Sequence, residues 1–128
     1  MTEGPVVAIL VLLNNFMHDF SAAGWLFGAV LLWMVRQRGR ENGLGAEGQL
    51  FVARCTRRLM WFCPAGIVFF GVFRAIAYRQ YEWNAAAGDA QVPLLMAKHV
   101  LFFLLFFAGL LEFVRAGRLP RGKADETP

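Results

Sequence analysis

Two histidines, His18 and His99, are the residues of this sequence best suited to carry chemistry. Each lies inside a long apolar run, where polar and ionisable side chains are expensive and usually mark a functional site. His18 belongs to a polar patch, which also includes Asn14, Asn15, Asp19 and Ser21. Imidazole is a common metal ligand, so two histidines from separate runs could bind one metal centre from both sides.

The composition places these histidines in a lipid environment. Hydrophobic residues make up 58% of the 128-residue chain and charged residues only 17%, far from the balance of soluble proteins. We expect a single membrane-embedded helical domain over residues 1–117 and a flexible basic and polar tail over 118–128. The net charge of +4 comes from arginines and lysines that flank the apolar runs, which indicates a membrane protein and excludes nucleic-acid binding.

Three apolar runs predict an all-α integral membrane protein with three transmembrane helices. They cover Val6–Val35, Leu59–Tyr81 and Val92–Val114, each long enough for the roughly 20 residues that cross a bilayer. The first run is too long, so residues 6–15 are expected to be tilted, to project outward or to pack on a partner. Apolar residues alternate with arginines after Gln49, which allows a short interfacial helix before the second run.

The distribution of positive charge predicts the orientation. The 36–58 connection holds six arginines and the C-terminal tail four basic residues, whereas the N-terminus and the 82–92 loop hold none. The N-terminus is therefore expected outside and the C-terminus in the cytoplasm, as in a multi-pass protein of a bacterial inner membrane. Cys55 and Cys63 lie near the cytoplasmic side and outside any C-x-x-C-H motif, so neither a disulfide nor covalent haem is expected.

His18, His99 and Arg74 fall at one predicted depth. Counting about 1.5 Å per helical residue from the arginine that bounds each run places them about 27, 24 and 24 Å from the cytoplasmic side. Two histidines at equal depth suit the two axial positions of one haem iron. We therefore expect one haem b per chain, with His18 and His99 as the metal ligands.

The neighbours of the two histidines suit a flat apolar ring. Small residues such as Ala22, together with Trp25, share a helical face with His18, while Phe102 and Phe103 lie near His99. The positive charges that could neutralise haem propionates are Arg74, Arg79 and Lys98.

Each of these features also has an ordinary structural explanation. The two histidines could simply form hydrogen bonds between helices. Gly24 and Gly28 form a G-x-x-x-G spacing, which is typical of close helix packing. Arg74 could pair with Asp19, and Glu112 is expected to meet arginines at the cytoplasmic surface.

Two stretches resemble a known family. Residues His18–Gly28 (HDFSAAGWLFG) and Val92–Phe102 (VPLLMAKHVLF) are similar to segments of bacterial CopD-type membrane domains and related small b-type cytochromes. The resemblance implies a helical membrane bundle concerned with haem-mediated electron transfer or with copper. Single-haem bundles of this kind usually have four spans and this chain has three, which favours a homo-oligomer or a partner subunit that closes the site.

Electron transfer is thus the leading functional hypothesis, with the chain acting as a carrier or accessory subunit and not as an enzyme. Its partners would be a membrane or periplasmic redox protein, or a quinone. A copper-handling protein is a second hypothesis; it would use Met17, His18, Met96 and His99, although Met17 and His18 point about 100° apart on a helix. A cofactor-free accessory subunit of a membrane complex is the third.

Overall fold

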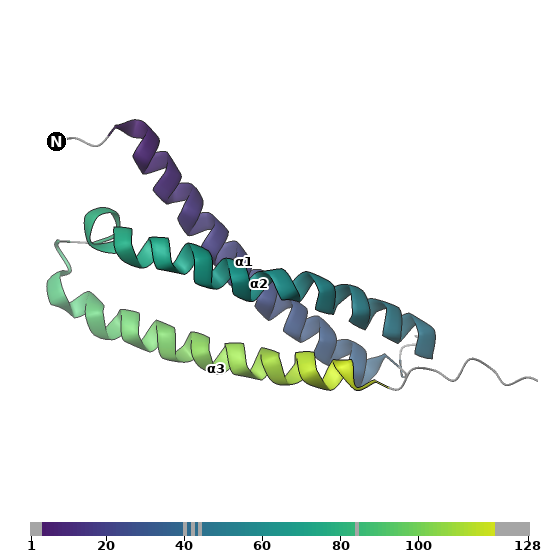
Figure 1. Cartoon of the computed structure of the whole chain (residues 1–128). Coiled ribbons are helices and arrows are strands. Elements are labelled where there is room, and N and C mark those ends of the chain that lie inside the picture. The colour runs from purple at the N-terminus through teal and green to yellow at the C-terminus, as the bar shows by residue number, and fades with distance from the viewer. Residues whose placement is uncertain (1–3, 40, 42, 44, 84, 120–128) are drawn as a thin grey trace, which may run out of the picture.

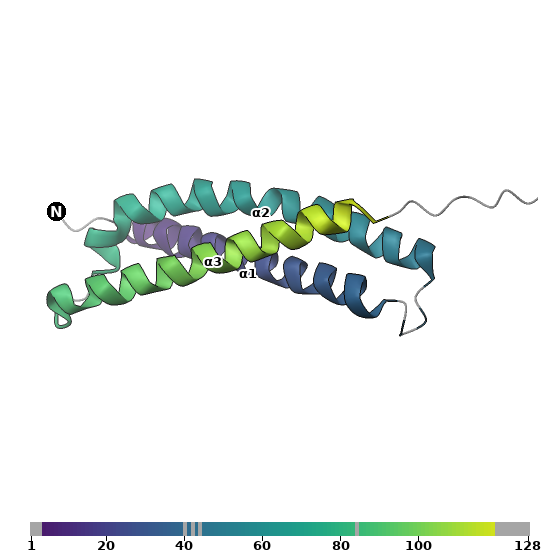
Figure 2. The same ribbon diagram turned by 90° about the horizontal axis from the view of Figure 1, so that it is seen from below.

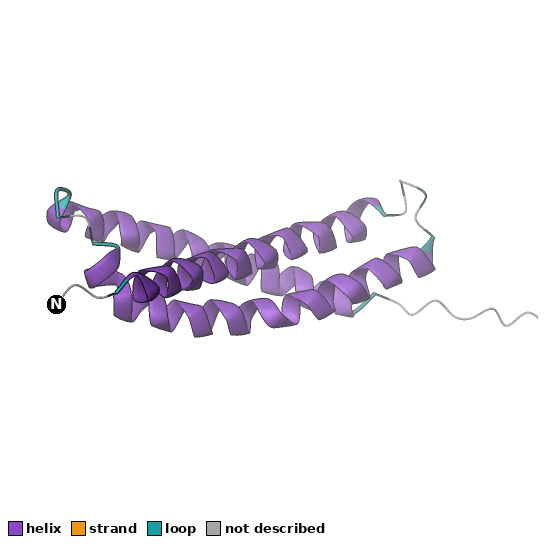
Figure 3. Cartoon of the chain, turned by 90° about the horizontal axis from the view of Figure 1, so that it is seen from above, coloured by secondary structure: helices purple, strands orange, loops and turns teal. Residues whose placement is uncertain are grey.

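The computed structural model is helical over almost all of the residues that it describes, which are 4–39, 41, 43, 45–83 and 85–119. It contains three long helices, α1 (Pro5–Arg38), α2 (Ala46–Tyr81) and α3 (Gln91–Gly117), with a short 3-10 turn, η1 (Gly88–Ala90), before α3 (Figures 1 and 3). Each long helix is long and apolar enough to cross a membrane. The predicted all-helical architecture with three such helices is therefore confirmed.

The helices begin and end where local sequence signals place them, with one difference. Pro5 occupies the start of α1, where its missing N–H costs nothing, and α1 ends at a loop that contains Gly43 with φ +77°. The segment after Gln49 is helical but is continuous with α2, and its place in a membrane interface stays a prediction. Residues 120–128 of the predicted tail lie outside the described residues.

The three helices form an elongated bundle in which α2 runs antiparallel to α1 (Figures 1 and 2). The α1–α2 loop and the end of α3 lie at one end, called here the α1–α2 end. The N-terminus and the loop joining α2 to α3 lie at the other, called the α2–α3 end.

Glycines on α1 allow α2 to approach closely. A Cβ atom added to Gly28 would lie 2.5 Å from Met60 Cγ, and one added to Gly24 would lie 3.2 Å from Cys63 Sγ. Met60 is fully buried at this contact. The G-x-x-x-G spacing therefore serves close helix packing, as its default interpretation predicts.

Trp25 joins α3 to α1. Its indole is 2% exposed and stacks on Phe106 with 4.7 Å between ring centroids, and its Nε1 donates a hydrogen bond to the Phe106 carbonyl oxygen at 3.3 Å. Gly109 leaves room for the indole, because an added Cβ there would lie 2.6 Å from Trp25 Nε1. The Trp25–Phe106 contact thus fixes the register of α3 against α1.

An ion-pair cluster joins α1 and α3 at the α1–α2 end. Arg36 donates to both carboxylate oxygens of Glu112, from Nε and Nη2, at 3.0 Å each. Arg115 donates to the same carboxylate at 3.0 Å. The prediction that Glu112 meets arginines is confirmed.

The first turns of α1, before Asn14, leave the other two helices (Figure 1). Its apolar side chains are mostly exposed, as at Val6 (66%), Ile9 (63%) and Leu12 (72%). α1 has 34 residues and measures about 51 Å, longer than the roughly 30 Å of bilayer hydrocarbon. The excess length predicted for the first run is thus present as a segment that packs little on the rest of the chain.

Candidate functional site

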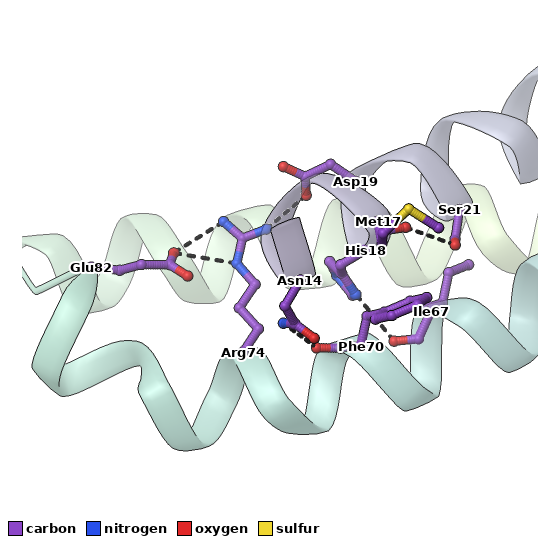
Figure 4. A network of polar contacts seen from close by, with 9 residues as sticks. All are labelled: Asn14, Met17, His18, Asp19, Ser21, Ile67, Phe70, Arg74 and Glu82. Carbon is purple, nitrogen blue, oxygen red and sulfur yellow. Dashed lines mark hydrogen bonds and ion pairs between the residues drawn. The ribbon is translucent and has the colours of Figure 1, made fainter. Parts of the chain in front are cut away.

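His18 lies between α1 and α2 (Figure 4). Its Nδ1 is 3.1 Å from the carbonyl oxygen of Ile67, and its ring lies over Gly71, where an added Cβ would be 3.0 Å from the ring Cε1. A carbonyl oxygen can only accept, so Nδ1 carries the proton. The neutral ring then has its lone pair on Nε2, the atom available to a metal.

The polar patch around His18 faces α2 (Figure 4). Asn14 Nδ2 donates to the Phe70 carbonyl oxygen at 3.0 Å, and Ser21 Oγ donates to the Met17 carbonyl oxygen of its own helix at 2.8 Å. Ser21 also contacts Gly66 of α2 so closely that no Cβ would fit there. These contacts hold the α1 segment that carries His18 against one face of α2.

Arg74 connects this segment to the end of α2. Its Nη1 donates to Asp19 Oδ1 at 2.7 Å, while Nη2 and Nε donate to Glu82 Oε2 at 3.0 and 3.2 Å (Figure 4). The alternative prediction, that Arg74 pairs with Asp19, is confirmed. Two carboxylates balance this guanidinium, so a haem propionate would have to displace one of them.

Sequence reasoning missed Glu82 as a partner of Arg74. Glu82 caps the C-terminus of α2, about two helical turns beyond Arg74. The signal for this pair in the sequence was the presence of opposite charges, Arg74 and Glu82, near the end of one helix. The glycines of α2 that accommodate Ser21 and His18, Gly66 and Gly71, were likewise visible in the sequence but were not used.

The two carboxylates should differ in their contribution to stability. Asp19 is 62% exposed in its side chain and Glu82 only 20%. We expect Asp19→Asn to lower the free energy of unfolding by no more than about 0.5 kcal/mol and Glu82→Gln by about 1 kcal/mol. Circular dichroism during unfolding in mixed micelles with increasing SDS measures both. A larger loss for Asp19→Asn would contradict the assignment of Glu82 as the stronger partner.

His99 lies on α3 and is exposed. Its Nδ1 is 2.7 Å from the carbonyl oxygen of Leu95, one turn earlier in the same helix. As in His18, the ring therefore has its lone pair on Nε2. In both histidines, Nδ1 is hydrogen-bonded to a backbone carbonyl oxygen and Nε2 has the lone pair.

The Trp25–Phe106 contact relates the two histidines. His18 precedes Trp25 by seven residues and His99 precedes Phe106 by seven residues. α1 and α3 run in the same direction, so both histidines lie about 10 Å along the helices from that contact, toward the α2–α3 end. Seven residues are nearly two full turns, so each histidine also lies close to the helical face of its aromatic residue.

In the part of the chain that the structure describes, the imidazole rings of His18 and His99 are not in contact with each other. His18 is bonded to the Ile67 carbonyl oxygen of α2, whereas His99 is exposed on α3. The small residues beside His18 are also partly covered, since Cys63 and Met60 fill the space at Gly24 and Gly28.

The remaining predicted site residues have varied surroundings. Trp25 belongs to the core, Ala22 is half-buried, and Phe102 is half-buried with its ring centroid 6.4 Å from that of Phe106. Phe103 is 59% exposed. Arg79 lies over the Trp83 ring at 6.0 Å, and Lys98 lines a pocket between α2 and α3.

The donor chemistry of His18 and His99 fits an axially ligated haem. Hydrogen-bonded Nδ1 groups orient ligating imidazoles and raise their basicity, and axial ligation needs only two side chains. The described residues contain no group of three or more His, Cys, Asp or Glu side chains that could hold a metal ion. Enclosure of a haem would have to come from a second chain, because His99 is exposed.

Comparison with models of protein families, with curated proteins and with solved structures finds no match for this chain. Its own residues are therefore the basis on which function is inferred.

Proposed function

We propose that this chain is a membrane electron carrier that binds one b-type haem through His18 and His99, within a homo-oligomer or a larger redox complex. The observation that carries the proposal is that the two imidazoles share the same hydrogen bonding and the same spacing from one helix contact. Both lie seven residues from the Trp25–Phe106 contact, and both bind a backbone carbonyl through Nδ1. Each leaves Nε2, the atom through which the residue would hold the haem iron.

Exposure of His99 supports a site shared with another subunit. An imidazole left uncovered beside lipid keeps an unsatisfied Nε2, which is costly in hydrocarbon. A haem and a neighbouring subunit would cover it. The exposed apolar first turns of α1 at the same end supply a surface on which such a subunit could pack.

Residues of the chain would orient the haem and balance the charge of its propionates. Bound haem would supply reversible one-electron transfer at its iron. Ile67 and Leu95 fix the two imidazole rings through their carbonyl oxygens. Arg79, exposed at the same end, is available to a propionate, whereas the charge of Arg74 is balanced by Asp19 and Glu82.

Positive charge supports an orientation with the histidines near the outer side of a bacterial inner membrane. The described arginines at the α1–α2 end outnumber the acidic residues there; they are Arg36, Arg38, Arg54, Arg57, Arg58, Arg115 and Arg118. Such an excess is typical of the cytoplasmic side.

An absorption spectrum of the purified protein and of its native complex tests the proposal. We expect a b-type α band after reduction with dithionite, and stoichiometric haem by the pyridine haemochrome method. His18→Ala and His99→Ala should each abolish the band, because loss of either axial ligand removes low-spin bis-histidine iron. Val100→Ala, a change at an exposed residue beside His99, should preserve it. The proposal fails if neither the chain nor its complex contains iron.

A cofactor-free accessory subunit is the second candidate, and the contacts of α1 favour it. His18 and Asn14 both bind carbonyls of α2, as side chains that only join two helices would. This candidate predicts that His18→Ala weakens the helix pair without changing the metal content. Copper handling through Met17, His18, Met96 and His99 would instead give copper without iron in the same metal measurement.

A further inference from the structure

A pocket opens between the last turns of α2 and the first half of α3. Its volume is about 520 Å³ and it is open to the surroundings. Its lining residues are Tyr78, Gln91, Leu94, Leu95, Ala97, Lys98 and Leu101. The wall is mostly apolar, with the Tyr78 hydroxyl donating a hydrogen bond to Gln91 Oε1 at 3.3 Å on one side.

Lys98 brings an uncompensated positive charge to this pocket. Its side chain is exposed and makes no ion pair with any described residue. Asp19 and Glu82, two acidic residues of the same end, are bound to Arg74. A positive charge without a protein partner beside apolar walls suits a molecule with an anionic head and a hydrocarbon chain.

The level of Lys98 suits the phosphate of a lipid. Lys98 precedes Arg115 by 17 residues, or about 26 Å of helix, close to the roughly 30 Å of bilayer hydrocarbon. With Arg115 at one membrane surface, the ammonium group lies just inside the other. A lysine at that depth extends its ammonium toward the headgroup region.

We propose that this pocket is a binding site for an anionic phospholipid, with one acyl chain against Leu94, Leu95 and Leu101 and the phosphate at Lys98. A zwitterionic lipid carries its own positive charge and gains less from an unpaired ammonium. The site therefore discriminates by net lipid charge. This proposal is independent of haem binding.

Native mass spectrometry of the full chain tests it by titration with phosphatidylglycerol and with phosphatidylcholine. We expect the first phosphatidylglycerol to bind about fivefold more tightly than phosphatidylcholine, as expected for one ion pair near the membrane surface. Lys98→Gln should abolish this preference, and Lys98→Arg should retain it. Ala97→Phe, which fills the pocket, should weaken binding of both lipids.

Arg118→Gln is the matched control, because it removes one exposed positive charge at the opposite end. It should leave the preference unchanged. Equal binding of the two lipids by the unaltered chain, or a preference that survives Lys98→Gln, would overturn the proposal. Loss of the preference in Lys98→Gln with no effect of Ala97→Phe would overturn the pocket as the site of the acyl chain.

Discussion

Replacing Gly28 by alanine is expected to destabilise the α1–α2 helix pair by about 2 kcal/mol, although alanine is the better helix former. The added Cβ would lie 2.5 Å from Met60 Cγ and 2.7 Å from Met60 Sδ. Met60 has no exposed surface, so its side chain cannot rotate outward to release the overlap. The helices would have to separate, with loss of packing on both sides of the contact.

Gly24→Ala provides the matched control, since it is the same substitution one turn away in the same motif. Its Cβ would lie 3.2 Å from Cys63 Sγ, an overlap of a few tenths of an ångström that a small shift relieves. Its cost should stay below about 1 kcal/mol. Unfolding in mixed micelles with SDS, followed by circular dichroism, measures both changes.

Shortening the opposing side chain should rescue the first variant. In the Gly28→Ala background, Met60→Ala would remove the overlapping atoms, so the two changes together should cost less than the sum of their separate effects. Additive effects, or equal losses for Gly24→Ala and Gly28→Ala, would show that the Gly28–Met60 contact does not set the distance between the helices.

The extent of the helices could be predicted from the sequence wherever hydropathy and helix boundaries coincide. The first run was predicted as 6–35 and α1 covers Pro5–Arg38, since a proline and a glycine bound the apolar stretch. The second run was predicted to begin at Leu59, with a separate short helix after Gln49 before it, but α2 is one continuous helix from Ala46. The part of α2 before Leu59 contains Arg54, Arg57 and Arg58, so hydropathy excluded it from the apolar run, whereas the backbone hydrogen bonds of the helix continue through it.

Partners of charged residues were predictable where two opposite charges fall at one level on different helices, as for Asp19 with Arg74 and Arg36 with Glu112. Such pairs have few alternatives in an apolar bundle. The neighbours of His18 were not predictable in the same way. Helical periodicity shows which residues share a face, whereas crossing angles decide which helix that face meets, and His18 meets α2.

Glu112→Gln should cause the other large loss of stability, about 2 kcal/mol, because it removes the charged acceptor of the half-buried Arg36. The Glu112 side chain is 13% exposed and its carboxylate accepts hydrogen bonds from Arg36 and Arg115. An amide can accept at only one atom and carries no charge. The two guanidinium groups would then repel each other at the point where α1 meets α3.

The cluster of Arg36, Glu112 and Arg115 joins α1 to α3, so its loss should also change how His99 on α3 lies relative to His18 on α1. The Trp25–Phe106 contact and the Arg36–Glu112 pair are two of the contacts that hold α3 on α1. Weakening the pair should therefore let α3 shift along α1. Fluorescence of Trp25, which is buried against Phe106, should move to longer wavelength in Glu112→Gln.

A double substitution distinguishes the effect of uncompensated charge from the effect of lost hydrogen-bond geometry. Arg36→Gln combined with Glu112→Gln leaves two amides that can bind each other without net charge, so it should be more stable than Glu112→Gln alone. Glu41→Gln, at an exposed position of the α1–α2 loop, should change stability by less than about 0.5 kcal/mol. If the double variant is no more stable than Glu112→Gln, uncompensated charge is not the cause of the loss. The contact would then depend on the fork-shaped hydrogen bonding of Arg36, which an amide pair cannot reproduce.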